Sequence, residues 1–176
     1  MACVPIKDTR KLREMMEVLA TKQNGFVYSL YMEFALSTAL RVGDILALKK
    51  MNIRDGIVYV KTQKNNTSHQ IALNDKCRKA MESYLEYKQP TDQIFDFSRQ
   101  WVHQFLKWAA DMCGLDKALV SCHTTRKSAA WRFYVQSGYD IMKTSAFLGH
   151  KYFSETRKYL GITSDEVNEI NLSYSW

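Results

Sequence analysis

Basic and nucleophilic side chains gather in four short segments of this chain. The first segment, ALRVGDILALKK, places Arg41 among apolar residues. A guanidinium there needs an anion, because a buried charge is tolerated only when it is paired. Asp44, three residues further on, could supply that anion. The segment alone therefore predicts either a local ion pair or a site for an external anion.

The second segment, VKTQKNNTSHQIAL, places Lys64 in a polar turn between two expected strands. A lysine on such a turn is usually a solvated surface charge, but the turn could also present a mobile ammonium group to a groove. Lys61 lies at the end of the first strand and is followed by Thr62. Lys61 and Lys64 are therefore alternative candidates for a mobile ammonium group at this turn.

The third segment, CHTTRKSAAWRFY, opens a predicted helix. His123 and Arg126 are three residues apart, so their side chains share one face of that helix. Free backbone N–H groups at a helix N-terminus favour an anion. The alternative is a histidine that caps the helix or is hydrogen-bonded in the core.

The fourth segment, LGHKYFSETRKYLGI, holds His150 and, nine residues later, Tyr159. Most tyrosines are packing residues with a hydrogen-bonded hydroxyl, and this chain has 10 of them. The bases Lys151, Arg157 and Lys158 crowd the same segment, which suits contact with a phosphate backbone. Alone, each of the four segments is a weak signal.

The charge balance indicates a polyanionic partner. The 176 residues carry 25 Lys and Arg against 18 Asp and Glu, a net charge of +7. All 25 bases precede residue 160, whereas the last 17 residues hold three acids and no base. Such a basic body favours a nucleic acid first and an anionic membrane surface second, although many soluble proteins have a high pI.

Several classes are disfavoured. The four cysteines form no Cys-x-x-Cys pair, and no two of His103, His123 and His150 fall at ligand spacing, so a metal site is not indicated. No apolar run approaches the ~18–20 residues of a membrane span. The N-terminal residues lack the apolar stretch of a signal peptide, so we expect a cytoplasmic protein.

Few glycines (7) and prolines (2) favour a helix-rich fold. Periodicity and capping residues predict a mainly α protein with one small antiparallel β-hairpin, formed as a single domain over 1–176. The strands are expected at 57–60 and 68–73. The helices are expected from Asp8 to Gly25 and at 26–40, 42–49, 74–88, 98–114, 123–138, 140–148 and 153–160.

In chain order, the four segments resemble the catalytic signature of the tyrosine recombinases, the phage integrase family. The resemblance covers roughly 8–162 and rests on an ordered pattern of residues: Arg41, Lys64, His123, Arg126, His150 and Tyr159. Successive members from Arg126 on are 24 and 9 residues apart, as in that family. Ala39 and Asp44 stand where the family motif has Gly and Glu, Thr125 where it usually has Leu, and Lys127 where it often has His.

The resemblance implies a tyrosine recombinase catalytic-domain fold and site-specific DNA cleavage and rejoining. Tyr159 would attack phosphorus, giving a covalent 3′-phosphotyrosine and a free 5′ hydroxyl. Arg41 and Arg126 would hold the non-bridging oxygens, and Lys64 would protonate the leaving oxygen. Tyr159-Leu-Gly-Ile is similar to the nucleophile motif of compact integrase-like proteins of Gram-positive bacteria and their mobile elements.

The resemblance also assigns roles to the remaining basic residues. His123 and His150 would hydrogen-bond the phosphate or assist proton transfer. The DNA backbone would be contacted by Lys61, Lys127, Lys151, Arg157 and Lys158. No cofactor, metal or ATP is implied, because the phosphotyrosine ester conserves the bond energy.

We expect double-stranded DNA as the partner, a homo-oligomer on that DNA, possible accessory DNA-binding proteins and no membrane. The tail 160–176 could exchange between protomers or dock on its own domain. Only seven residues precede the first expected helix, so no N-terminal core-binding domain is expected; the chain would be a minimal recombinase or the catalytic part of a longer one. The alternatives are a type IB topoisomerase-like enzyme and a non-catalytic DNA-binding module of the same fold.

Overall fold

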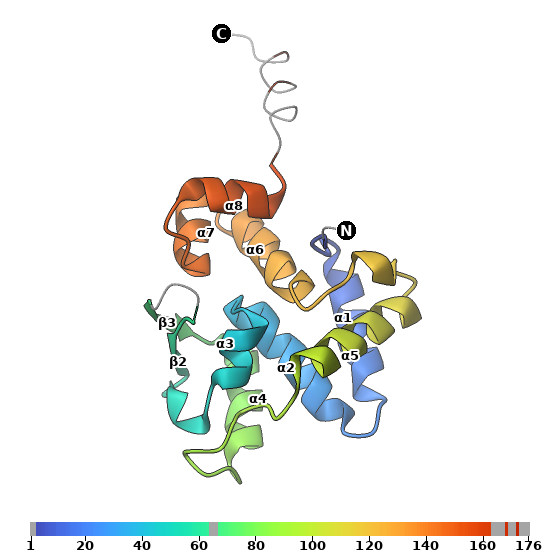
Figure 1. Cartoon of the computed structure of the whole chain (residues 1–176), viewed down its shortest axis with the longest axis vertical. Coiled ribbons are helices and arrows are strands. Elements are labelled where there is room, and N and C mark those ends of the chain that lie inside the picture. Colours follow the sequence, from blue (N-terminus) through green and yellow to red (C-terminus); the bar gives the residue numbers. More distant parts are fainter. Residues whose placement is uncertain (1–2, 64–66, 163–167, 169–171, 173–176) are drawn as a thin grey trace. The chain divides into compact units, whose positions relative to one another are not determined.

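The computed structural model describes residues 3–63, 67–162, 168 and 172 (Figure 1). The chain divides into two compact units, a first unit of Met1–Ala129 and a second unit of Ala130–Trp176. The expectation of a single domain over 1–176 stays a prediction.

The first unit is built from helices whose starts are set by short-range capping. Its helices are α1 (Thr9–Ala20), α2 (Gly25–Thr38), α3 (Val42–Ala47), α4 (Asp75–Leu85), α5 (Arg99–Met112) and the start of α6 (Thr124–Gln136), with 3₁₀ turns η1 (Lys50–Asn52) and η2 (Lys117–Leu119). The side chains of Asp8, Asn74 and Ser98 accept hydrogen bonds from backbone N–H groups in the first turns of α1, α4 and α5. Capping side chains thus set the starts of the helices expected from residues 8, 74 and 98.

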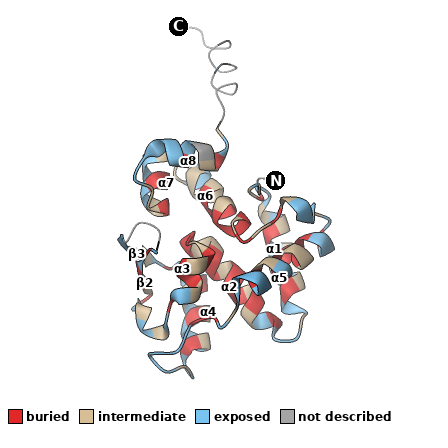
Figure 2. Cartoon of the chain, viewed as in Figure 1, coloured by how far each residue is buried: buried red, intermediate tan, exposed pale blue. Residues whose placement is uncertain are grey.

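The apolar α2 runs through the core of the first unit, where α1 and α4 pack against it and α5 packs against α1. Red marks the buried residues along these helices in Figure 2, and Tyr31 and Phe34 of α2 are fully buried. The rings of Tyr28 and Phe105 stack with centroids 5.1 Å apart, and Tyr31 meets Phe105 edge to face at 5.6 Å. This aromatic layer fixes α2 against α5.

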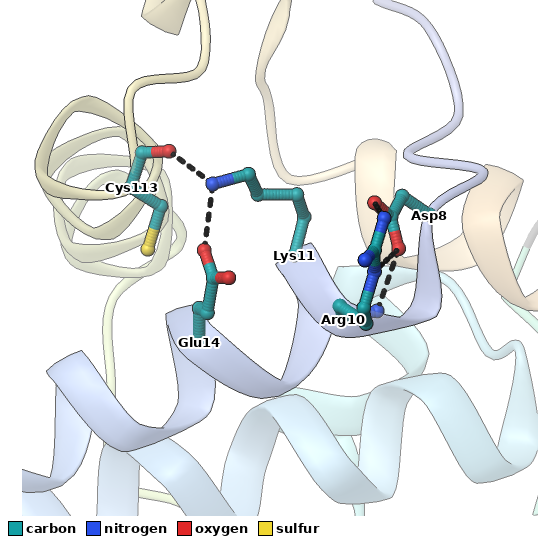
Figure 3. A network of polar contacts seen from close by, with 5 residues as sticks. All are labelled: Asp8, Arg10, Lys11, Glu14 and Cys113. Carbon is teal, nitrogen blue, oxygen red and sulfur yellow. Dashed lines mark hydrogen bonds and ion pairs between the residues drawn. The ribbon is translucent and has the colours of Figure 1, made fainter.

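Polar contacts at the surface join α1 to the end of α5 (Figure 3). The Lys11 ammonium donates to Glu14 on its own helix at 2.7 Å and to the backbone carbonyl of Cys113 at 3.0 Å. The start of α1 is held by Asp8, which also pairs with Arg10.

A three-stranded antiparallel sheet lies beside α3 in Figure 1. Its strands are β1 (Ile53–Arg54), β2 (Ile57–Lys61) and β3 (Ser68–Ala72), in the order β1-β2-β3. Val60 pairs with His69 and Lys61 with Ser68, so the predicted hairpin is confirmed. The additional strand β1 turns into β2 through Asp55-Gly56, both at positive φ.

Several expected helix bounds differ from the structure. The first helix was expected to end at Gly25, but α1 ends at Ala20, and Gly25 instead opens α2 after Asn24 at a φ of 60°. A Cβ at position 25 would lie 2.4 Å from the Leu19 carbonyl oxygen, so the close approach of two helices explains this glycine. The helix expected at 74–88 ends three residues earlier, at Leu85.

The second unit contains the remainder of α6 followed by α7 (Ile141–Leu148) and α8 (Phe153–Leu160), which pack against each other. Asp140 caps α7, and the rings of Phe133 and Phe147 stack at 4.3 Å between α6 and α7. Most of the tail 160–176 lies outside the described residues. Throughout the described ranges, no helix combines the length and apolarity that crossing a membrane requires.

Candidate active site

Arg41 stands at the turn between α2 and α3. Ala39 ends α2 at a φ of 51°, and Arg41 occupies the extended N-cap position of α3. Its side chain is 21% exposed, and one terminal nitrogen lies 4.0 Å from a carboxylate oxygen of Asp44. The local Arg–Asp pair is therefore present, at a distance too long for a hydrogen bond.

Asp44 connects α3 to the far end of β2. Its side chain is 2% exposed, and Oδ1 accepts a 2.9 Å hydrogen bond from the backbone N–H of Gln63. Oδ2 is also buried and has no hydrogen-bond partner among the residues that the structure describes. Lys64 follows Gln63 directly and lies outside the described residues, whereas Lys61 is exposed at the end of β2.

Residues at the start of α6 bring a second guanidinium to the same turn. Arg126 is buried, and its Nη1 donates to the carbonyl of Ala39, two residues before Arg41. The first turn is fixed because Ser121 Oγ accepts from the His123 N–H at 3.1 Å. Arg41 and Arg126, 85 residues apart in the sequence, thus meet at one turn.

His123 is half-buried and lines a cavity of about 320 Å³ in the first unit. The cavity is lined by Arg41, Val42, Gly43, Asp44, Gln63, Arg99 and His123. Burial first, and then the positive charges of Arg99, Arg126, Arg41 and Lys127, hold the pKa of His123 below its usual value of 6.5. The imidazole is therefore neutral at pH 7 and able to accept a proton.

In the second unit, the structure brings His150 and Tyr159 together. Their ring centroids are 5.5 Å apart in an edge-on arrangement, and Tyr159 is half-buried. His150 Nδ1 forms a 2.9 Å hydrogen bond with the hydroxyl of buried Thr156, one turn before Tyr159 on α8. Gly149, at a φ of 63°, makes the left-handed turn that delivers His150 from the end of α7.

The residues predicted to contact the DNA backbone differ in their surroundings. Lys127 is half-buried, and its ammonium donates to the Cys3 carbonyl at 2.7 Å, which ties α6 to the N-terminal segment. Lys151 is exposed, with its ammonium 5.4 Å from the centroid of the Tyr152 ring, and Arg157 is exposed on α8. The side chain of Lys158 lies outside the described residues.

Two cavity-lining residues were missed by sequence reasoning. Gln63 and Arg99 reach the cavity of Arg41 and His123 from the end of β2 and the start of α5. Neither residue was predicted to take part in the site, because only tertiary packing brings Gln63 and Arg99 to this cavity. Within residues 3–63 and 67–162, no three His, Cys, Asp or Glu side chains gather as metal ligands.

The fold is that of the tyrosine recombinase catalytic domains. The chain is similar to the structure of the XerH site-specific recombinase bound to difH substrate in a pre-cleavage complex, with a TM-score of 0.74 and 17% identity. That match covers 96% of this chain and 54% of XerH. The profile described as the phage integrase family matches residues 8–166, so the chain belongs to that family.

Similar sequences carry recombinase names. The probable integrase/recombinase YoeC of Bacillus subtilis (strain 168) is 27% identical over 169 residues, covering 92% of this chain and 91% of YoeC. The tyrosine recombinase XerD of Halalkalibacterium halodurans is 28% identical over 153 residues, covering 79% of this chain and 50% of that protein. The chain thus spans nearly all of one relative and half of the other.

Proposed function

We propose that this chain cleaves and rejoins DNA strands at specific sites through a covalent 3′-phosphotyrosine intermediate. The observation that carries the proposal is the pairing of Tyr159 with His150 in the second unit, inside the segment that matches the phage integrase family. The pre-cleavage complex of XerH with its DNA substrate supports the same reaction. Family membership favours recombination over topoisomerase-like relaxation.

Two guanidinium groups neutralise the scissile phosphate in this proposal. Arg126 donates to the turn that precedes Arg41, and each guanidinium can form charge-assisted hydrogen bonds to non-bridging oxygens. Because these donors are positioned before the reaction, they stabilise charge that develops in the transition state.

The nucleophile is the Tyr159 hydroxyl. Its oxygen attacks phosphorus and the bond from phosphorus to the 5′ oxygen breaks, so one ester bond replaces another. The phenol proton passes to a base, for which neutral His123 is our candidate. Lys64 gives a proton to the leaving 5′ oxygen, with Lys61 as the other candidate. In the reverse step a 5′ hydroxyl attacks the phosphotyrosine and releases Tyr159.

His150 positions this chemistry. Its Nδ1 is engaged by Thr156, so the opposite nitrogen, Nε2, is the one directed to other groups. We propose that Nε2 hydrogen-bonds the scissile phosphate. The edge contact with the Tyr159 ring fixes the two side chains relative to each other.

The partner we propose is double-stranded DNA, bound by a homo-oligomer of this chain in the cytoplasm. The net charge of +7 supports a polyanionic partner. Contacts to the backbone are assigned to Lys61, Lys127, Lys151, Arg157 and Lys158. Accessory DNA-binding proteins and an exchange of the tail between protomers complete this proposal.

Trapping the covalent intermediate tests the proposed function. A nicked duplex that carries the cognate site, or a fragment pool if the site is unknown, is incubated with the protein without metal or ATP. Denaturant-resistant protein–DNA adducts are then scored. We expect adducts with the wild type and with Tyr152→Phe, an exposed tyrosine of the same segment, and none with Tyr159→Phe. Adducts that persist in Tyr159→Phe would contradict the assignment.

A further inference from the structure

Arg99 extends the basic cluster around Arg41 and has no assigned role. It is the first residue of α5, is exposed, and lines the cavity that Arg41 and His123 also line. Its charge is the second cause, after burial, of the lowered pKa of His123. The Arg99 guanidinium therefore lies close enough to the His123 imidazole to lower its pKa.

A second cavity continues from the first along α5. It has a volume of about 580 Å³ and is lined by Arg99, Gln100, His103, Gln104, Ser121, Cys122 and His123. Arg99 and His123 belong to both cavities, so they stand where the two meet. Two neighbouring cavities that share Arg99 and His123 fit successive groups of a polymer better than one isolated anion.

Charges around the first cavity are unbalanced. Arg41 and Arg99 are opposed by Asp44, the one carboxylate among the described residues that line it. Asp44 already accepts from Gln63 and lies beside Arg41. Within the described part of the chain, Arg99 forms no ion pair or hydrogen bond. Neighbouring like charges repel, so this arrangement is favoured when an anion is bound.

We infer that Arg99 binds a second phosphate of the DNA strand, next to the phosphate that Arg41 holds. The inference rests on the proposed function, because it takes the ligand of Arg41 to be the scissile phosphodiester. A planar guanidinium can hold two phosphate oxygens at once, and Arg99 is free to turn toward them because it lies exposed at a helix start. Arg99 thereby fixes the position of the strand relative to the scissile bond.

The salt dependence of DNA binding measures this contact directly. Binding of a fluorescent duplex of arbitrary sequence is followed by anisotropy over a series of KCl concentrations. Each phosphate contact contributes about 0.9 to the slope of log K against log salt. We expect Arg99→Ala to reduce the slope by about that amount, and Arg99→Lys, which keeps the charge, to restore it.

The matched control is Arg13→Ala. Arg13 is exposed on α1, lines a different groove, and has no ion pair within the described residues. It should leave the slope unchanged. If the wild type binds DNA and Arg99→Ala has the same slope as Arg13→Ala, the inference is wrong while the proposed function stands. If the wild type neither binds DNA nor forms adducts, both are wrong.

A neutral phosphate locates the contact. Single methylphosphonates are placed at each position flanking the scissile phosphate of the nicked substrate. At one neighbouring position the wild type should lose about ten-fold in adduct formation, whereas Arg99→Ala should lose nothing further. A loss in Arg99→Ala that depends on the identity of one base, and not on a phosphate, would overturn the inference in favour of a base contact.

Discussion

At the scale of single residues, the site depends on guanidinium groups that cannot be exchanged for ammonium groups. Arg126 is buried, and its Nη1 donates a hydrogen bond to the Ala39 carbonyl. This bond fixes the direction of the other N–H groups of the guanidinium. A lysine would keep the charge and lose both the fork geometry and the bond to the turn of Arg41. The two arginines are thus coupled through the backbone between them.

We therefore expect Arg126→Lys to slow cleavage by about 10²–10³-fold, the usual cost of removing a preorganised donor. DNA binding should change little, because the charge is retained. Single-turnover adduct formation on a nicked substrate gives the rate, and anisotropy gives the affinity. Arg132→Lys, on the same helix, is the control and should cleave normally. Equal rates for the two variants would remove Arg126 from the chemistry.

The pKa of His123 sets the pH below which cleavage should decline. Burial is the largest cause of the lowered pKa of His123 in the folded protein. The positive charges of four basic residues lower this pKa further: Arg99, Arg126, Arg41 and Lys127. A base must be neutral, so cleavage should persist as the pH falls below 6.5 and decline only as it passes the lowered pKa. In Arg99→Gln one of the positive charges is gone, and the decline should begin at a higher pH. Imidazole nitrogen NMR on the DNA-free proteins should show the same order of pKa values; a His123 pKa above 6.5 would contradict the electrostatic picture.

At the scale of elements, Asp44 joins α3 to the segment that follows β2. Its Oδ1 accepts from the N–H of Gln63, the residue directly before Lys64 in the sequence. Asp44→Ala should leave this N–H without its acceptor and Arg41 without its carboxylate neighbour. We expect a loss of about 1–3 kcal/mol in the free energy of unfolding, measured by urea denaturation.

Asp44→Asn separates the two roles of this carboxylate. The amide oxygen can still accept from Gln63, so stability should fall less than in Asp44→Ala, while the charge beside Arg41 is lost. Because Lys64 follows Gln63 directly, the rate of adduct formation should fall more in Asp44→Ala than in Asp44→Asn. If the two variants behave alike in both measurements, the hydrogen bond to Gln63 does not matter.

Elements that depend on neighbours in the sequence were predictable, and those that depend on distant contacts were not. Asp8, Asn74 and Ser98 act within one helical turn, so the helix starts could be placed from the sequence alone. Strand β1 is two residues long and exists only because β2 lies beside it, which leaves no periodicity to detect. Gly25 looked like a helix end, but it permits the close approach of α2 to the end of α1.

The same distinction applies to the site. The pattern of arginine, histidine and tyrosine could be recognised because it is an order and a spacing along the chain, which the sequence shows directly. Arg99 carries no such pattern, and its place beside His123 follows from the packing of α5 in the first unit. The contact of Asp44 with the end of β2 is likewise a tertiary contact, spanning 19 residues.

At the scale of the whole molecule, the start of the chain is fastened to the helix that begins at the site. The Ile6 N–H donates to Ser128 Oγ at 2.8 Å, across 122 residues, and Ser128 Oγ donates in turn to the Thr124 carbonyl. The Val4 N–H bonds to the Leu119 carbonyl. With Lys127 bound to the Cys3 carbonyl, residues 3–6 form a strap along the first turns of α6.

A strap of this kind links the N-terminal residues to the orientation of Arg126. Ser128→Ala removes the buried acceptor of the Ile6 N–H, so we expect a loss of about 1–3 kcal/mol in the free energy of unfolding. The strap should also open, which faster amide exchange at Ile6 would report. Ser154→Ala, at an exposed serine of α8, should change neither quantity. If Ser128→Ala loosens the strap but leaves the cleavage rate at its wild-type value, the first turn of α6 holds Arg126 in place without help from residues 3–6. A fall in the cleavage rate that accompanies the loosened strap would show that the position of Arg126 depends on residues 3–6.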